Sequence, residues 1–280
     1  MNGKTVLITG ASAGVGLQSA IGLAKLGAEV VMVGRDEGRT AQAAALVKSQ
    51  TGNPAISYLL ADLSSLKDVR KLAQEFKDKY KKLDVLLNNA GAIFFWRQVS
   101  VDGYEISLAL NHLNYFLLTD LLLDMVKAAP AGRIVNVASR GHYRGHLNFD
   151  DLQSQHRYNA MQTYCMSKLM NVLFTYELAR RLQGTNVTAN CLHPGFVASN
   201  FATNNGWWVR LGMAFMSQRI SVEDGAKCSI FLASSPEVQG VSGKYFNYDT
   251  KETRSSDESY DEAKAKRLWD VTEELVAIGK

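Results

Sequence analysis

The chain has 280 residues, a length that a single large α/β domain often reaches. Hydrophobic residues make up 46% of it and charged residues 21%, an ordinary mixture for a globular protein with a sizeable core. The net charge of +4 comes from 31 basic and 27 acidic residues spread along the chain rather than gathered in a basic stripe, so we expect no nucleic-acid partner.

The three cysteines, Cys165, Cys191 and Cys228, are odd in number and lack CxxC spacing, which argues against a disulfide framework and a cysteine metal site. The first apolar run is only a few residues long and is followed by glycines, and no uncharged apolar stretch reaches about 18 residues. We therefore expect a cytoplasmic protein with no transmembrane segment and no bound metal.

Short apolar runs rich in β-branched residues alternate with helical patterns along the chain. Strands are predicted at 5–9, 29–33, 56–60, 85–88, 133–138 and 186–192. The segments between them, such as 65–80, show the 3.6-residue period of helices. This alternation predicts one α/β domain over 1–280, a doubly wound parallel sheet of about seven strands with helices on both faces. A last helix, within 258–280, is expected to dock by an apolar stripe.

The stretch TGASAGVG, at 9–16, follows the first predicted strand and opens the first predicted helix. Its three glycines allow a tight turn and a close approach to a pyrophosphate, whose charge the amides at the helix N-terminus would face. A bare structural turn is the alternative, but the strand, loop and helix setting favours a dinucleotide and a Rossmann fold. The predicted cofactor contacts here are Gly10, Ser12, Ala13, Gly14, Val15 and Gly16.

The second predicted strand ends at Gly34, which offers no carboxylate to a ribose 2′-hydroxyl, and Arg35 follows. A guanidinium suits a 2′-phosphate, so we predict NADP rather than NAD. In the alternative reading, Arg35 is a solvated loop charge and Asp36 takes the ribose. The ends of the next two strands should line the same edge of the sheet with Asp62, Leu63, Asn89, Ala90 and Gly91.

Two tyrosine and lysine pairs share a four-residue spacing, Tyr164 with Lys168 and Tyr260 with Lys264. On a helix, residues four apart lie on one face, so either pair could point at one ligand. The two pairs differ in what precedes them. The helix that carries Tyr164, at about 158–183, follows a strand whose end presents Ser139, whereas Tyr260 follows the last strand in a run of acidic residues. A lysine and a nicotinamide cation beside Tyr164 would lower the pKa of its phenol and make it an acid or base near neutral pH.

These motifs resemble the short-chain dehydrogenase/reductase family, which matches TGASAGVG, NNAG, Ser139, YCMSK and HPGFVAS in order along nearly the whole chain. The resemblance implies that Tyr164 transfers the proton, Ser139 orients the carbonyl or hydroxyl, and Lys168 holds the ribose and lowers the tyrosine pKa. It implies that Asn111 holds a water in the proton relay. It also implies a homodimer or homotetramer paired through the helices that start near 100 and 158. Pro194, Gly195, Val197 and Ser199 are the implied cofactor contacts after the sixth strand.

Within the family the chain is most similar to retinol dehydrogenase-like reductases. The features are the 25-residue step from Ser139 to Tyr164, the insert FDDLQSQHRYNAMQTYCMSK, the ELARRL that follows and the ending RLWDVTEELV. The chain departs from the retinoid enzymes in ASR, where a second serine is usual, and we expect it to lack their membrane anchor ahead of the first strand.

Aromatic residues cluster in two segments that could contact a substrate. AIFFW at 92–96 and the segment 196–220 would together form an apolar pocket, with 196–220 as a lid; an oligomer contact, a membrane-surface contact or simple packing are the alternatives for that segment. His142 and Tyr143 are placed at the substrate rim, which we favour over a metal pair of His142 with His146. The predicted substrate contacts are Phe94, Trp96, His142, Tyr143, Phe196, Trp207 and Trp208.

The sequence thus predicts an NADP(H)-dependent oxidoreductase that interconverts a carbonyl and an alcohol on a lipophilic small molecule. A catalytically silent NADP-binding sensor or scaffold is the alternative. The presence of Asn111, Ser139, Tyr164 and Lys168 together favours the enzyme.

Overall fold

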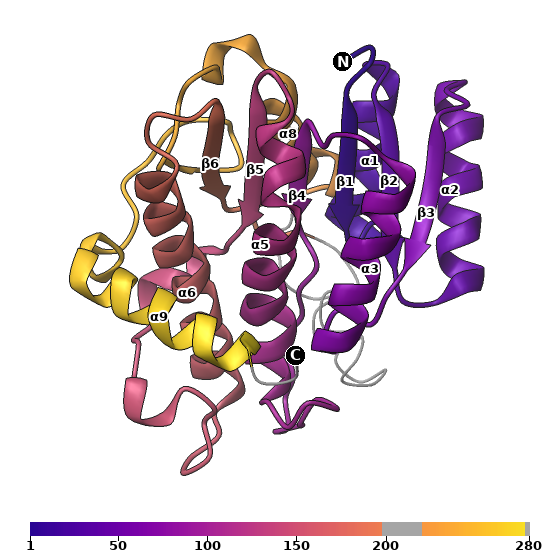
Figure 1. The fold of residues 1–280 in the computed structure, drawn as a ribbon. Coiled ribbons are helices and arrows are strands. Elements are labelled where there is room, and N and C mark those ends of the chain that lie inside the picture. Colours follow the sequence, from indigo (N-terminus) through magenta and orange to yellow (C-terminus); the bar gives the residue numbers. More distant parts are fainter. Residues whose placement is uncertain (198–219, 278–280) are drawn as a thin grey trace.

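A parallel sheet of seven strands, in the order β3-β2-β1-β4-β5-β6-β7, organises the fold (Figure 1). The structure is a computed structural model that describes residues 1–197 and 220–277. The predicted single-domain α/β fold is confirmed, and the six predicted strands are observed. The strands are β1 (Thr5–Thr9), β2 (Glu29–Gly34), β3 (Ile56–Leu60), β4 (Val85–Asn88), β5 (Gly132–Val137), β6 (Val187–Leu192) and β7 (Tyr245–Phe246).

Helices cover both faces of this sheet, because successive side chains of a strand point to opposite faces. In β1, Val6 and Ile8 pack in one buried cluster with residues of α1, α2 and α8, whereas Leu7 packs in another with residues of α3, α5, α6 and α9. The helices are α1 (Gly14–Lys25), α2 (Glu37–Thr51), α3 (Leu66–Lys79), α4 (Ile106–Leu108), the π-helix η1 (Ala109–Leu113), α5 (Asn114–Lys127), α6 (Ala160–Arg181), α8 (Val222–Ser234) and α9 (Glu262–Ala277), with short 3₁₀ turns η2 (Arg140–Arg144), η3 (Phe149–Asp151), η5 (Pro236–Val238) and η6 (Asp257–Tyr260).

The strand order reverses direction between β1 and β4, the position where open α/β sheets bind ligands. The loops that leave the carboxyl ends of β1, β4 and β5 therefore meet at one edge of the sheet. That edge carries the glycine loop, the NNAG segment and Ser139.

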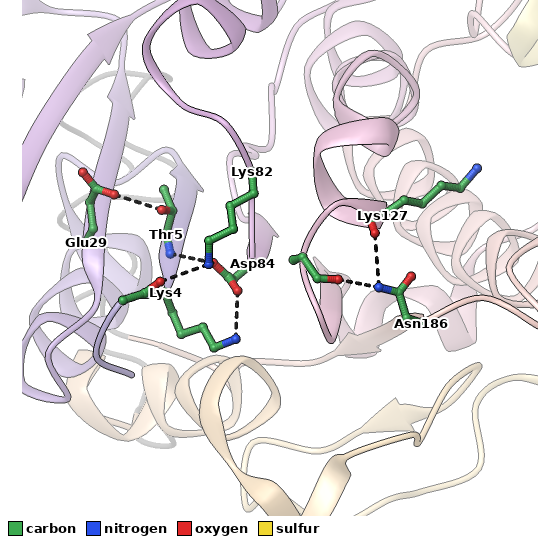
Figure 2. Close-up of polar contacts among 9 residues, drawn as sticks. Lys4, Thr5, Glu29, Lys82, Asp84, Lys127 and Asn186 are labelled. Atoms are coloured by element: carbon green, nitrogen blue, oxygen red, sulfur yellow. Dashed lines mark hydrogen bonds and ion pairs between the residues drawn. The ribbon is translucent and has the colours of Figure 1, made fainter.

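At the opposite, amino edge a buried carboxylate joins the first and fourth strands (Figure 2). Asp84 accepts hydrogen bonds from Lys4 Nζ (2.9 Å), Lys82 Nζ (2.7 Å) and the Thr5 amide (3.0 Å), and its side chain is 2% exposed. Burial opposes its charge, but the hydrogen bonds from Lys82, Thr5 and Lys4 outweigh burial and lower the pKa of this carboxyl. The cluster ties the start of β1 to the start of β4, the two strands from which the glycine loop and the NNAG segment follow.

The last helix, α9, lies across α5 and α6 on one face of the molecule (Figure 1). The Trp269 ring packs 4.8 Å from the Phe116 ring of α5 and 5.7 Å from the Phe174 ring of α6. The helix predicted within 258–280 thus docks by its apolar stripe, as expected. It covers the two helices through which the resemblance implies pairing, and every residue of α6 from 163 to 178 is buried within one chain.

The second tyrosine and lysine pair does not share a helix, so the expected common face is wrong. Tyr260 ends the 3₁₀ turn η6 and Lys264 belongs to α9, with an extended Asp261 between them. Lys264 Nζ instead donates to Glu258, 2.8 Å away.

One helical stretch in the described residues, Ile106–Lys127, is long and apolar enough to span a membrane by length and composition. Its apolar window is 72% buried inside the fold, as expected of a core helix.

Candidate active site

The glycine loop between β1 and α1 has the geometry that a pyrophosphate needs. Gly10 and Gly14 adopt positive φ angles of 64° and 58°, and a Cβ on Gly16 would lie 2.5 Å from both Gly10 O and Asn89 Nδ2. The N-cap residue of α1, Ala13, makes no side-chain hydrogen bond to the helix, and its first turn carries no acidic residue. The amides of this turn therefore face the loop without a competing side chain, which fits a dinucleotide phosphate.

Thr9 holds the NNAG segment against the glycine loop. Its hydroxyl accepts hydrogen bonds from the Asn89 amide (2.8 Å) and the Ala90 amide (3.0 Å), and Asn89 Nδ2 donates to Thr9 O (2.8 Å). Asn89 thus holds the two loops together with its side chain. Sequence reasoning missed Thr9, whose only signal is a hydroxyl directly before the first glycine.

The end of β2 excludes a carboxylate from the place where the cofactor ribose would lie. A Cβ on Gly34 would fall 2.1 Å from Thr40 Oγ1, so no acidic side chain fits there without a shift. Asp36 is already the N-cap of α2, where it accepts from the Arg39 amide at 2.8 Å. The Arg35 side chain is 71% exposed and lies 3.9 Å from Asp62 Oδ2. At the end of β2, Arg35 thus has an exposed guanidinium, whereas the Asp36 carboxylate caps α2.

After β3, Asp62 and Leu63 differ in what they can offer a ligand. Asp62 Oδ1 accepts from the Ser64 amide (2.9 Å) and hydroxyl (2.6 Å), which fixes the turn. The Leu63 side chain is buried in the core, so only its backbone faces the cofactor edge.

Asn111, Tyr164 and Lys168, three of the four predicted catalytic residues, lie against the loops that follow β4 and β5. The fourth, Ser139, belongs to the loop after β5. A Cβ on Gly91 would lie 3.1 Å from Asn111 Oδ1 and 3.2 Å from Lys168 Nζ, and one on Gly141 would lie 3.3 Å from the Tyr164 ring. Ser139 follows β5 and its side chain is hydrogen-bonded to Tyr164. The structure therefore brings Asn111, Ser139, Tyr164 and Lys168 together.

In the protein chain, the pKa of Tyr164 is shifted mainly by burial and not by Lys168. Burial raises the pKa of Tyr164 well above its usual value, and the hydrogen bond with Ser139 lowers it in part. Lys168 Nζ lies 6.0 Å from the centre of the Tyr164 ring and donates to Val137 O at 2.9 Å. Burial also lowers the pKa of Lys168 to about 7. Lys168 is not among the groups that shift the Tyr164 pKa in the chain alone, and the expected lowering by the lysine and a nicotinamide cation together stays a prediction.

Asn111 lies in the π-helix η1, and its side chain holds the NNAG loop. Asn111 Oδ1 accepts from the Ala92 amide (2.9 Å), and its Nδ2 donates to Ala92 O and to Ser167 Oγ (3.0 Å each). Both amide hydrogens are thus used within the protein, so a proton-relay water implied by the resemblance would not find a side-chain donor there. π-helices are often found at functional sites.

The predicted substrate residues do not all lie at the mouth of the site. Trp96 is 63% and Phe196 43% exposed, Phe94 is nearly buried, and Tyr143 is half exposed with its hydroxyl donating to Arg254 O. His142 is completely buried, so the expected contact between His142 and a substrate is wrong. Trp207, Trp208 and Ser199 lie outside the described residues.

The loop after β6 is described only at its start. A Cβ on Gly195, whose φ is +86°, would fall 2.2 Å from Ile220 Cδ1, and Val197 pairs with Ile220 in a parallel bridge. Pro194, Gly195 and Val197 therefore lie at the carboxyl end of β6, beside the predicted cofactor edge. The predicted lid 196–220 falls mostly outside the described residues.

The two loop histidines diverge. His142 turns inward to Ser139 O and the Ser256 amide, whereas His146 lies at the surface, 3.0 Å from Glu258. Among the described residues, no group of three His, Cys, Asp or Glu side chains could hold a metal ion. All three cysteines are free and buried.

Comparison with known families agrees with this geometry. The family model of the short chain dehydrogenases matches residues 4–209. The chain belongs to the short-chain dehydrogenases. The family's match covers every strand from β1 to β6 and all four predicted catalytic residues.

Among similar curated proteins, this short-chain dehydrogenase is most readily described as retinol dehydrogenase-like. Retinol dehydrogenase 14 of Homo sapiens is 42% identical over 300 residues, covering 100% of this chain and 88% of that protein. Retinol dehydrogenase 13 of Homo sapiens is 40% identical over 283 residues, with 99% and 85% covered.

Solved structures show the same fold. A crystal structure of a protein from Mycobacterium Paratuberculosis matches with a TM-score of 0.81 and 32% identity over 99% of this chain and 94% of that one. The RhlG/NADP active-site complex of Pseudomonas aeruginosa matches with a TM-score of 0.71 and 26% identity over 89% and 96%.

Proposed function

We propose that this short-chain dehydrogenase is an NADP(H)-dependent oxidoreductase that interconverts a carbonyl and an alcohol on a lipophilic small molecule. The observation that carries the proposal is the convergence of Ser139, Tyr164 and Lys168 at the carboxyl edge of the sheet, where the glycine loop also lies. A general acid, its hydrogen-bonding partner and a cation thus face the place where a nicotinamide would lie.

When bound, the nicotinamide gives or takes the hydride. In the reducing direction the O–H bond of Tyr164 breaks, and its proton goes to the carbonyl oxygen as that oxygen gains the electron pair. The Ser139 hydroxyl stabilises the phenolate that remains, because its hydrogen bond lowers the Tyr164 pKa. Lys168, held by Val137 O, supplies positive charge on the same side of the ring. Oxidation of the alcohol runs through the same groups in reverse.

Preference for NADP rests on Arg35. Two observations support it: a carboxylate at Gly34 would not fit without a shift, and the Asp36 carboxylate caps α2, whereas the guanidinium of Arg35 is exposed at the end of β2. A guanidinium binds a phosphate through two parallel hydrogen bonds.

Preference for a lipophilic substrate rests on Phe94, Trp96 and Phe196, which lie in the loops that follow β4 and β6. The similar proteins named retinol dehydrogenases support the same class. The lid role of 196–220 stays a prediction, and so do Trp207 and Trp208 as substrate contacts.

The test is turnover of aldehydes, ketones and alcohols with NADPH, NADH and their oxidised forms, followed at 340 nm. Tyr164→Phe should lower kcat at least about a hundredfold, because the transferable proton is lost, while NADPH still binds. Tyr260→Phe is the matched control and should keep wild-type turnover. A Tyr164→Phe enzyme that keeps more than a tenth of the activity would contradict the role of Tyr164. Coenzyme binding without turnover of any compound in the wild type would instead favour the sensor or scaffold.

A further inference from the structure

Two buried histidines hold the peptide that follows Ser139. His142, in η2, places its Nδ1 atom 2.6 Å from Ser139 O. His193, which follows β6, accepts a hydrogen bond from the Arg140 amide at its own Nδ1, 3.1 Å away. The peptide that joins Ser139 to Arg140 is thus held at its carbonyl oxygen by one imidazole and at its amide by the other.

These contacts fix the tautomer of each ring. A carbonyl oxygen only accepts, so His142 carries its proton on Nδ1, and its Nε2 accepts from the Ser256 amide at 3.1 Å. His193 must be unprotonated at Nδ1 to accept from Arg140. The two neutral rings are therefore opposite tautomers. Protonation of His142 would place an N–H at Nε2 against the Ser256 amide, and protonation of His193 would place one at Nδ1 against the Arg140 amide.

The surroundings favour the neutral form of both rings. His142 is 0% exposed, and burial lowers its pKa to about 4; the rings of Tyr143 and Tyr245 lie 4.1 Å and 4.7 Å from its own. Burial lowers the pKa of His193 to about 3, and the charges of Arg140 and of a protonated His142 act in the same direction.

The held segment packs directly on the reacting tyrosine. Ser139 Oγ accepts from the Gly141 amide at 3.0 Å. A Cβ on Gly141 would lie 3.3 Å from Tyr164 Cε1 and 3.4 Å from Ser139 Oγ, so the turn and the ring are in close contact. A displacement of the Ser139 peptide would therefore change the hydrogen bond between Ser139 and Tyr164.

We propose that His142 and His193 are positioning residues for the reaction: as neutral imidazoles of opposite tautomer, they hold the Ser139 peptide so that its hydroxyl stays bonded to Tyr164. The proposal rests on the proposed function, in which Tyr164 transfers the proton. Neither histidine needs to touch substrate or coenzyme.

Asparagine and glutamine substitutions distinguish histidines that hold the Ser139 peptide by hydrogen bonds from histidines that only fill space in the core. The Asn side chain presents its polar atoms close to the position of Nδ1, whereas Gln presents them close to Nε2. His193→Asn should keep an acceptor for the Arg140 amide, and His142→Asn should keep a donor to Ser139 O. We expect both Asn variants to stay within about threefold of wild-type kcat, and both Gln variants to fall about tenfold or more with the KM for coenzyme unchanged.

The pH profile gives a second readout. Because the Ser139 hydrogen bond lowers the pKa of Tyr164, the rising limb of alcohol oxidation should move to higher pH in the Gln variants, as in Ser139→Ala. The other titratable groups that act on Tyr164 and its neighbours are Lys168, Cys165 and Tyr115. His146→Gln, on the same loop but exposed and bonded to Glu258, is the matched control and should leave kcat and the pH profile unchanged. Equal kcat values and superimposable profiles for the Asn and Gln variants would overturn the proposal.

A measurement that needs no turnover keeps this test distinct from that of the proposed function. Long-range ¹H–¹⁵N NMR spectra of the wild-type protein should show the proton of His142 on Nδ1 and that of His193 on Nε2, with both rings neutral at pH 6. The reverse tautomers, or rings that protonate near pH 6.5, would overturn the positioning role even if Tyr164→Phe is inactive. Correct tautomers in a protein that turns over nothing would leave the histidines in place and remove the proposed function.

Discussion

At the scale of single residues, Tyr164 shows how burial changes an electrostatic expectation. The spacing to Lys168 suggests a cation beside a phenol, which would lower the phenol pKa. In the fold both groups are withdrawn from water, and desolvation disfavours the charged form of each, raising the pKa of Tyr164 and lowering that of Lys168. The tyrosine is therefore protonated throughout the neutral range in the chain alone and suited to act as an acid in carbonyl reduction.

The coenzyme prediction also belongs to one residue, Arg35. Arg35→Ala should raise the KM for NADPH about tenfold or more, because charged hydrogen bonds to a phosphate are worth roughly 1.5–3 kcal/mol, and should change the KM for NADH little. Steady-state kinetics with both coenzymes provide the measurement. Arg254→Ala, at a separate exposed loop, is the control and should alter neither value. Equal losses with NADPH and NADH would show that Arg35 serves the adenine half or the fold.

At the scale of secondary-structure elements, the join between β1 and β4 depends on Asp84 (Figure 2). Asp84→Asn removes a buried charge and leaves Lys4 and Lys82 without their common partner. We expect a loss of about 2–4 kcal/mol in the free energy of unfolding, toward the lower end because the lysines are about a third exposed. Urea denaturation measures it.

Glu75→Gln is the matched control for Asp84→Asn. Its carboxylate makes a surface pair with Lys71 at 3.7 Å, and its loss should change stability by less than about 0.5 kcal/mol. The Asp84 contribution should also fall away in acid: its folded pKa is lowered, so its stabilisation is present above the unfolded pKa and is lost as pH falls through the folded pKa. Equal stability of Asp84→Asn and wild type at pH 7 would show that the cluster does not hold the strands.

At the scale of the whole molecule, α9 covers a surface that a second copy of the chain could otherwise bind. Because residues 163–178 of α6 are already buried within one chain, we expect the predicted homodimer or homotetramer not to form through α6. Sedimentation velocity of the wild type and of Trp269→Ala at micromolar concentration is the measurement. Trp269→Ala, which removes the ring that packs on both Phe116 and Phe174, should destabilise the fold by about 2–4 kcal/mol and promote self-association. A stable dimer that survives unchanged in Trp269→Ala would place the pairing surface elsewhere.

Acid stability is a second property of the whole molecule. Burial lowers the pKa values of His112 and His142 to about 4 and that of His193 to about 3. As pH falls below about 6.5, the unfolded chain takes up these three protons before the folded one, so stability is fully present above 6.5 and is lost toward pH 4 and 3. We expect the free energy of unfolding to drop by roughly 1 kcal/mol per histidine and pH unit between pH 6 and 5.

Urea titrations at pH 7, 6 and 5 check this expectation. The substitution His156→Gln, at an exposed position before α6, should leave the slope unchanged. A free energy of unfolding that stays constant from pH 7 to 5 would contradict the neutral, buried state of the three histidines.

The sequence by itself determined the order of elements and the chemistry of the site. Alternating apolar runs and helical periods are local signals, so six strands and the parallel sheet could be predicted, whereas β7, only Tyr245–Phe246, is too short to show a pattern. Gly10, Gly14 and Gly16, with Ser139, Tyr164 and Lys168, were readable because the motif spacing matches the ends of predicted elements.

Only the tertiary structure decided which of these side chains are buried and what they contact. His142 was placed at the substrate rim, yet it is enclosed between Ser139 and Ser256, a contact across 114 residues that no local pattern encodes. The pKa values of Tyr164 and Lys168 depend on how completely the fold removes both side chains from water. The burial of α6 depends on where α9 docks. Desolvation and long-range contact are properties of the packed molecule, because they arise from residues that are distant in sequence.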